Sequence, residues 1–290
     1  YYRARIMANA IEKLNTIAIG NIEKFNTLTD ANIEKLNTLE FTSGPAGLEA
    51  IDPDESLFSY SNTISQQDSV DSRDITLSIW LKDDGSSSGE DTIFNMHTSG
   101  SGGLAMNYQN GAGIRIMSWT SSTWEFDYTI DANIDDGNWH HFVYSRDGSA
   151  STHYLYVDGT DQTSNIVITG GDRSSFAGNV WQGTTYYNVH LLTETSGGGN
   201  KVGAFVTQLF IDYNYYNLST GSVLDKFYDD GAVNMGTDGT SSGLTQPRMF
   251  HTGDTGDFFT KGGNTGAWNY GISTTGSGAD ISADNGPAFG

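Results

Sequence analysis

The sequence predicts an all-β protein, an antiparallel jelly-roll sandwich with a short repetitive arm at its N-terminus. Of its 290 residues, 36 are glycines and 12% are aromatic, a composition that suits many turns and pleated strand surfaces. Beyond residue 57, apolar and polar side chains alternate along several segments, which is the pattern of strands with one buried face. Before residue 43 a unit of 11 residues repeats, so the chain divides into an arm and a body.

The arm contains three near-copies of one segment, at residues 11–17, 22–28 and 33–39. Each copy has apolar side chains at its first, fourth and seventh positions. On an α-helix, an 11-residue period produces one continuous apolar stripe. The residues of this stripe are Ile11, Leu14, Ile17, Ile22, Phe25, Leu28, Ile33, Leu36 and Leu39.

A second conformation of the arm is also open. Asn-Thr pairs and Gly20 are unfavourable inside helices, so each unit could instead form one helical turn, capped by Asn21 or Asn32, and then an extended piece. In either case the stripe is too thin to form a core. We therefore expect residues 1–42 to anchor the protein, by forming a homo-oligomer with a trimer favoured or by docking on another protein. The alternative is that the arm folds back onto its own chain.

The chain is strongly acidic, because 14 Lys and Arg residues against 35 Asp and Glu residues give a formal net charge of −21. Nucleic acids need cationic partners for their phosphates, so no nucleic-acid binding is expected. The absence of cysteine excludes disulfides and thiolate metal sites. No run of about 18 apolar residues occurs, so no membrane partner is expected. Residues 1–9 lack the apolar core of a secretory signal.

After a Gly- and Pro-containing linker at residues 43–56, the body is predicted to form a sandwich over residues 57–235. A Gly- and aromatic-rich extension, residues 236–290, is expected to pack on it. Asp147-Gly148 and Asp158-Gly159 are typical of hairpin turns, since glycine adopts a positive φ at little cost. The strands predicted from alternation are residues 75–82, 123–130, 139–146, 152–157, 186–192 and 201–213.

One short helix is predicted within the body. Ser219 or Thr220 would cap it, and Gly231 would end it. Many short strands with so little helix are typical of a jelly-roll sandwich, in which few sheet edges stay exposed. The apolar face of the helix would consist of Val223, Leu224, Phe227 and Tyr228.

Three segments of the body, in order, resemble laminin-G-like and concanavalin A-like lectin domains. They are ITLSIWLK at 75–82, DGNWHHFVYSRDG at 136–148 and YLYVDG at 154–159. The resemblance covers about residues 57–233 and implies the same sandwich, with a structural role for the paired histidines. It implies little about function, since one sandwich fold supports many roles.

The arm and the C-terminal extension carry a second resemblance. Asn-Ile-x-Lys-x-Asn repeats joined to a laminin-G-like domain resemble virion structural proteins of tailed bacteriophages, as do residues 248–250, 256–259 and 266–269 of the extension. This resemblance implies a non-enzymatic capsid decoration, head fibre or tail fibre on the exterior of the virion. Its partners would be capsid or tail proteins of the same particle and cell-surface polysaccharide.

A hydrolase of this fold would need two carboxylic acids beside the scissile bond. In the related glucanases these lie as E-x-D-x-x-E or E-x-D-x-E, and the nearest match is Glu125-Phe126-Asp127. The third acid is absent, because Thr129 and Ile130 occupy its two possible positions. We therefore expect Glu125, Asp127 and Thr129 to form an outward polar face, and we expect no enzymatic activity. A glycan depolymerase and a soluble carbohydrate-binding module are the alternative functions.

Metal binding has three candidate acidic loops, at residues 83–85, 135–138 and 229–231. Asp135, Asp136 and Asn138 offer the hard oxygens that calcium prefers, although the same residues are typical of an ordinary turn. His140 and His141 are adjacent, so on a strand they point to opposite faces and cannot share a metal ion.

Glycan binding would use exposed aromatic rings beside polar groups. Trp119 and Trp124 flank a Ser/Thr turn and are the first candidates, followed by Trp181 and Tyr187. Trp80 and Trp139 lie inside predicted strands and are expected in the core.

Overall fold

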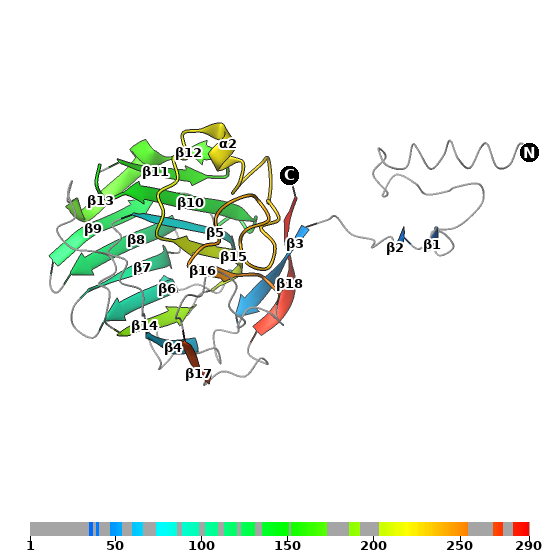
Figure 1. Cartoon of the computed structure of the whole chain (residues 1–290), viewed down its shortest axis with the longest axis horizontal. Coiled ribbons are helices and arrows are strands. Elements are labelled where there is room, and N and C mark those ends of the chain that lie inside the picture. The colour runs from blue at the N-terminus through cyan, green and yellow to red at the C-terminus, as the bar shows by residue number, and fades with distance from the viewer. Residues whose placement is uncertain are drawn as a thin grey trace, which may run out of the picture. The chain divides into compact units, whose positions relative to one another are not determined.

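The computed structural model describes the chain in segments and divides it into two units, residues 1–46 and 47–290 (Figure 1). No helix in the described part is long and apolar enough to cross a membrane. The described residues are 35–36, 39–40, 47–53, 60–65, 74–85, 89–98, 102–109, 113–120, 123–130, 135–150, 152–172, 186–191, 203–254, 269–274 and 281–289.

In the first unit, β1 (Lys35–Leu36) and β2 (Leu39–Glu40) form a small antiparallel pair. Both strands belong to the third repeat, so a continuous helix does not run through this copy, and its backbone is extended there. The rest of the apolar stripe, from Ile11 to Ile33, and the side chains of Leu36 and Leu39 lie outside the described residues. The anchoring role of the arm therefore stays a prediction.

The second unit contains two antiparallel sheets (Figure 1). The first sheet has the strand order β12-β11-β10-β5-β15-β3-β18, and β16 also pairs with β15. Its strands are β3 (Gly47–Pro53), β5 (Ile75–Asp83), β10 (His140–Asp147), β11 (Thr152–Val157), β12 (Thr160–Asp161), β15 (Ala204–Asp212), β16 (Met249–His251) and β18 (Ile281–Ala288).

The second sheet has the order β13-β9-β8-β7-β6-β14-β4-β17. The chain passes from β12 of the first sheet to β13 through a 3₁₀ turn, η3 (Thr163–Asn165). The strands are β4 (Tyr60–Ser65), β6 (Glu90–Thr98), β7 (Gly102–Gln109), β8 (Gly113–Thr120), β9 (Thr123–Ile130), β13 (Ile166–Asp172), β14 (Tyr186–Leu191) and β17 (Asn269–Thr274).

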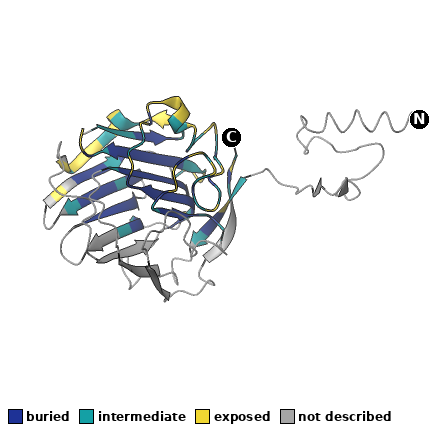
Figure 2. Cartoon of the chain, viewed as in Figure 1, coloured by how far each residue is buried: buried dark blue, intermediate teal, exposed yellow. Residues whose placement is uncertain are grey.

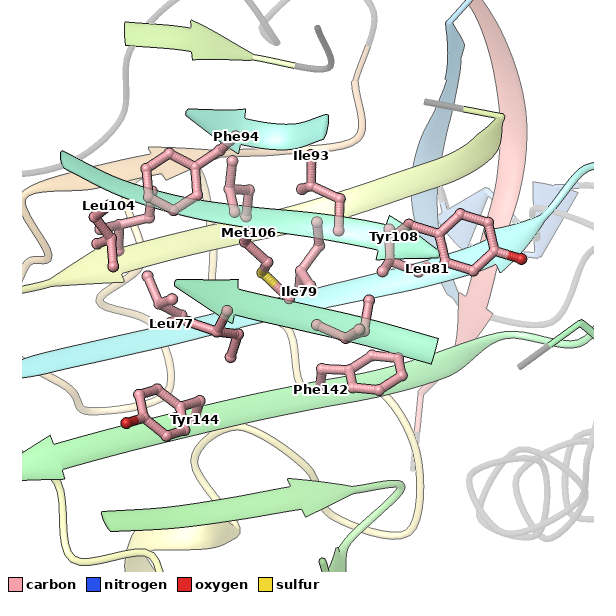
Figure 3. Packing of buried hydrophobic residues seen from close by; sticks show 14 of the residues in the cluster. Leu77, Ile79, Leu81, Ile93, Phe94, Leu104, Met106, Tyr108, Phe142 and Tyr144 are labelled. Carbon is pink, nitrogen blue, oxygen red and sulfur yellow. The ribbon is translucent and has the colours of Figure 1, made fainter. Parts of the chain in front are cut away.

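The main core lies between the two sheets, and along most of the central strands its residues come from every second position. In Figure 3 the side chains of β5 and β10 lie close to those of β6 and β7. Fully burying one such side chain contributes roughly 1.5 to 3 kcal/mol. The labelled residues are Leu77, Ile79, Leu81, Ile93, Phe94, Leu104, Met106, Tyr108, Phe142 and Tyr144.

A buried cation also joins the sheets. Arg146 of β10 is 1% exposed, and its guanidinium donates a hydrogen bond to the hydroxyl of Tyr128 on β9 at 2.8 Å. The same guanidinium lies 5.1 Å from the ring centroid of Phe126. Ring contacts of this kind stabilise a cation that burial has removed from water.

The first sheet is buried on both faces, which the alternation along β5 did not predict. The residues of β5 that alternate with the core positions, Thr76, Ser78 and Trp80, are at most 4% exposed, and Figure 2 shows β5, β10 and β15 as buried. The reason is a segment, residues 214–248 (the cover), whose apolar side chains pack on the outer face of this sheet. This second cluster consists of Val143, Tyr156, Phe210 and Phe250 of the sheet with Leu218, Phe227, Met235 and Leu244 of the cover.

The predicted helix is present within the cover but is shorter than expected. α2 (Gly221–Leu224) is one turn long, and the Thr220 side chain makes no capping hydrogen bond. The predicted apolar face is nevertheless correct, because Phe227 is fully buried and Tyr228 stacks on Trp80. Packing on the sheet, rather than helix propensity, holds this segment.

The strands predicted from alternation are confirmed, but the predicted domain limits differ from the structure. Residues 47–53, expected within the linker, form β3, with Ala50 and Ile51 fully buried. β3 pairs with β18, and β17 pairs with β4, so the extension contributes strands to both sheets and does not merely pack on them. The sandwich therefore extends from Gly47 to the last described residues.

Candidate functional site

The outer face of the second sheet is the candidate site. On β8 and β9 the side chains of Ile116 and Tyr128 point into the core. Because side chains alternate along a strand, Arg115, Met117 and Asp127 point to the opposite, outer face. No described element forms a second apolar cluster on this face, although Ala105 and Met117 at its centre are buried.

A β-bulge brings two tryptophans together on the outer face. Trp119 of β8 pairs with Trp124 of β9, but the next pair is Ser118 with Phe126, so β9 has one extra residue at Glu125. The extra residue turns Trp124 to the face opposite Phe126, whereas strict alternation placed both on one face. The two indole rings meet edge to face with centroids 5.9 Å apart, and Trp124 is 41% exposed.

Beside the tryptophans, one arginine is held by two carboxylates. Arg115 donates from Nε and NH2 to the two carboxylate oxygens of Asp127, both at 2.8 Å, and from NH1 to Glu90 Oε1 at 3.0 Å. Asn107 Nδ2 donates to the same Glu90 oxygen at 2.5 Å. The guanidinium lies 5.9 Å from the ring centroid of Trp124. These paired hydrogen bonds fix the plane of the guanidinium next to the indole.

The hydrogen bonds decide the charge state of this group. Burial of Asp127 favours its neutral form, but hydrogen bonds from Arg115 and Thr169 outweigh this and lower the pKa of the Asp127 carboxyl. The hydrogen bond to Asp127 raises the pKa of Arg115. Asp127 is therefore an ionised partner of Arg115.

The expectation of a solvated polar face around Asp127 was wrong in part. Asp127 and Thr129 do lie away from the core, but the Asp127 side chain is only 5% exposed because it lies against Arg115, and Thr129 is partly buried. The Glu125 side chain lies outside the described residues. Sequence reasoning missed Glu90, Asn107 and Arg115, since they lie on three strands and their proximity depends on register.

Two side-chain oxygens on the central strands complete the outer face. Asn107 is 8% exposed, and within the part of the chain that the structure describes its Oδ1 has no hydrogen-bond partner. The same holds for Oδ1 of Asn95 on β6. Asn95 pairs with Ala105 of β7, which in turn pairs with Met117 of β8, and Ala105 and Met117 are both buried.

The side chains of the other predicted glycan contacts lie outside the described part of the structure. Trp181 lies outside the described residues. Tyr187 is on β14, where its backbone pairs with Ile64 of β4, and its side chain is likewise not described. Trp80 is buried as expected, whereas Trp139 is only partly buried.

Calcium binding at the predicted loop stays a prediction, and the side chains of this loop have protein partners. Tyr108 donates its hydroxyl proton to Asp135 Oδ1 at 2.6 Å, while Asp136 Oδ1 accepts from the Asn138 amide at 2.8 Å. His140 Nε2 lies 3.0 Å from the same Asp136 oxygen. The carboxylates thus bind protein donors instead of converging, and no cluster of three metal-binding side chains occurs among the described residues.

The two histidines have separate structural roles. His140 Nδ1 lies 2.6 Å from Asp158 Oδ2, and this bond, reinforced by Asp136, raises the pKa of His140 to about 9. His141 contacts the rings of both Trp80 and Tyr228, and its Nε2 lies 2.8 Å from Ser78 Oγ. Complete burial lowers the pKa of His141 to about 3.

Comparison with known proteins concerns the fold of the sandwich. Residues 58–192, which include the outer face of β6 to β9, match a laminin-G-type family model described as the concanavalin A-like lectin/glucanases superfamily. The fold is concanavalin A-like. The predicted laminin-G-like sandwich is thereby confirmed. No curated protein matches the chain by sequence.

Solved structures similar to the concanavalin A-like chain share little sequence with it. A native heptameric SAP-like pentraxin from Limulus polyphemus has 12% identity and a TM-score of 0.43 over 63% of this chain and 84% of its own. A Bacteroides ovatus protein assigned to carbohydrate binding has 10% identity and a TM-score of 0.49 over 88% of this chain and 66% of its own. The Ruminococcus gnavus IT-sialidase CBM40 bound to α2,3-sialyllactose has 12% identity and a TM-score of 0.41, over 56% and 91%.

Proposed function

We propose that the chain is a non-enzymatic carbohydrate-binding protein that holds a glycan on the outer face of its second sheet. The observation that supports this most directly is the exposed indole of Trp124, fixed edge to face by Trp119 and flanked by the guanidinium of Arg115. A flat aromatic face with hydrogen-bonding groups at its side suits a sugar ring, which has apolar C–H faces and polar edges.

The charge arrangement supports binding without hydrolysis. A glycosidase needs one carboxylic acid with a raised pKa that can protonate the leaving group. Here Glu90 and Asp127 both bind Arg115, and the pKa of Asp127 is lowered. Neither carboxylate is placed to act as a general acid while this network is intact.

The proposal is tested by titrating the full chain with a panel of oligosaccharides and measuring heat or tryptophan fluorescence. Trp124→Ala should weaken binding at least about tenfold, equivalent to about 1.4 kcal/mol. Ile168→Ala is the matched control, because Ile168 is 52% exposed but pairs with the core-facing Tyr128 on the neighbouring strand. Equal affinity of both variants and the parent chain would refute this site.

A second proposal, based on the 11-residue repeat, concerns attachment. We infer that residues 1–42 anchor the protein to the capsid or tail of a bacteriophage particle, so that the lectin-like domain is displayed on the virion exterior. Several copies on one particle would turn weak glycan affinity into avidity. The regular apolar positions of the arm support this role because a thin apolar stripe needs an external surface.

The anchoring proposal is tested by deleting residues 1–42. The concanavalin A-like unit has its own core and should stay folded, while its mass in solution should fall to that of a monomer. Light scattering measures the mass, and an unchanged melting temperature is the control for folding. If the full chain is itself monomeric and does not join particles, the anchor is refuted without affecting the glycan proposal.

A further inference from the structure

The chemical class of the ligand follows from the charges on the outer face of the second sheet. Arg115 is the one Lys or Arg residue in the described strands of this sheet. Its guanidinium is enclosed by the carboxylates of Glu90 and Asp127, so the three side chains together carry a formal charge of −1. The chain as a whole carries −21.

An acidic sugar would need a cation with free donors, usually an arginine fork. A guanidinium has five N–H groups. The Nε proton and one NH2 proton of Arg115 bind Asp127, and one NH1 proton binds Glu90. The bidentate edge is therefore occupied by a carboxylate of the protein itself, which a carboxylate or sulfate on a glycan would have to displace.

An uncharged sugar does not meet this obstacle. Its hydroxyl groups can donate to the Glu90 carboxylate, which is 33% exposed, and can accept from the remaining N–H groups of Arg115, which is 23% exposed. A C–H face of the sugar can lie on Trp124 at the same time. Asn107 donates to Glu90 and holds this acceptor in place.

We infer that the ligand of this face is an uncharged oligosaccharide, and that glycans carrying sialic acid, uronic acid or sulfate are excluded by the Glu90–Arg115–Asp127 network. The inference rests on the proposed glycan-binding function and adds the ligand class to it. The network thus determines selectivity, because it presents hydrogen-bonding groups while neutralising the one Lys or Arg charge in the described strands of this sheet.

The experiment compares two sets of probes on the full chain by calorimetry at physiological salt. Neutral probes are hexasaccharides of xylose, glucose, mannose and N-acetylglucosamine, and acidic probes are sialyllactose, oligogalacturonate and a heparin hexasaccharide. The parent chain should bind at least one neutral probe at least about tenfold more tightly than any acidic one. Glu90→Gln, which keeps the shape and removes one negative charge, should strengthen binding of an acidic probe at least about tenfold.

Glu49→Gln is the matched control for net charge, because Glu49 is exposed on β3 of the other sheet. It should leave the affinity for acidic probes unchanged. Binding of an acidic probe to the parent chain as tightly as any neutral one would overturn the inference and leave the proposed function standing. If no probe of either kind binds, the proposed function fails, and the ligand class fails with it.

Discussion

His140 and His141 are neighbours in the chain, yet they should affect stability in opposite ways as pH changes. Contact with Asp158 and Asp136 raises the pKa of His140 from 6.5 to about 9, so the folded state favours its charged form. Burial lowers the pKa of His141 from 6.5 to about 3, so the folded state favours its neutral form.

The sign of each contribution follows from proton linkage. The stabilisation from His140 is fully present below pH 6.5 and is lost as pH rises through about 9. The stabilisation from neutral His141 is fully present above pH 6.5 and is lost as pH falls toward about 3. Together the two histidines predict a free energy of unfolding that is greatest near pH 6.5.

Each pH unit between the folded and unfolded pKa values corresponds to about 1.4 kcal/mol per proton. Over the roughly two pH units below 6.5, the need to keep His141 neutral should therefore lower the free energy of unfolding by about 2 to 3 kcal/mol. The carboxylate partners of His140 are 35% and 40% exposed, so solvent weakens the interaction. Over the corresponding range above pH 6.5, we expect the loss of charge on His140 to lower the free energy of unfolding by about 1 kcal/mol.

The assay is urea unfolding at a series of pH values, followed by tryptophan fluorescence, on the parent chain, His141→Gln and His140→Gln. Packing losses shift each variant by an amount that does not depend on pH, so the slopes carry the information. His141→Gln should reduce the slope of the unfolding free energy against pH below pH 6.5. His140→Gln should reduce the slope above pH 6.5. If His141→Gln and the parent chain lose stability equally toward low pH, the burial argument is wrong.

Three further predictions concern stability. Gly159→Ala should cost about 1 to 3 kcal/mol, because φ is +71° and a Cβ would lie 2.7 Å from a ring carbon of Tyr228. Gly85→Ala is the control: φ is +80° but the space around a Cβ is open, so it should cost only about 1 kcal/mol when both variants are compared by thermal melts. Phe210→Ala should cost about 3 to 5 kcal/mol by urea unfolding, and a loss below about 1 would contradict its packing against Phe227. A chelator should leave the melting temperature unchanged, and a clear drop would restore the calcium loop at Asp135 and Asp136.

Local patterns predicted much of the fold, because alternation and Asx-Gly turns act between near neighbours. β5, β9, β10, β11, β14 and β15 all lie where alternation placed them. The pairing of β3 with β18 was missed because the two strands lie at opposite ends of the body, and the sequence of neither strand indicates its partner. The cover was missed for a related reason: Ser78 and Thr76 look solvent-facing until a remote segment buries them.

The candidate site was predicted in part. Trp119 and Trp124 were named together because they flank a turn, and the structure places them on one face, although by a bulge that alternation cannot detect. The Glu90–Arg115–Asp127 network could not be found from spacing, because its members come from three strands. Only the register of those strands brings the three side chains together.

The cover on the first sheet has a consequence for how the protein can gain binding strength. Gln208 of β15 donates to the Val233 carbonyl at 3.0 Å, and Phe227 inserts beside Phe210, so this layer is fastened at several points. A ligand could reach the outer face of the first sheet only if this layer detached, so the described part of that face is closed to recognition. Higher valency would come from several copies of the chain, and the spacing between the copies would then set how strongly they bind together.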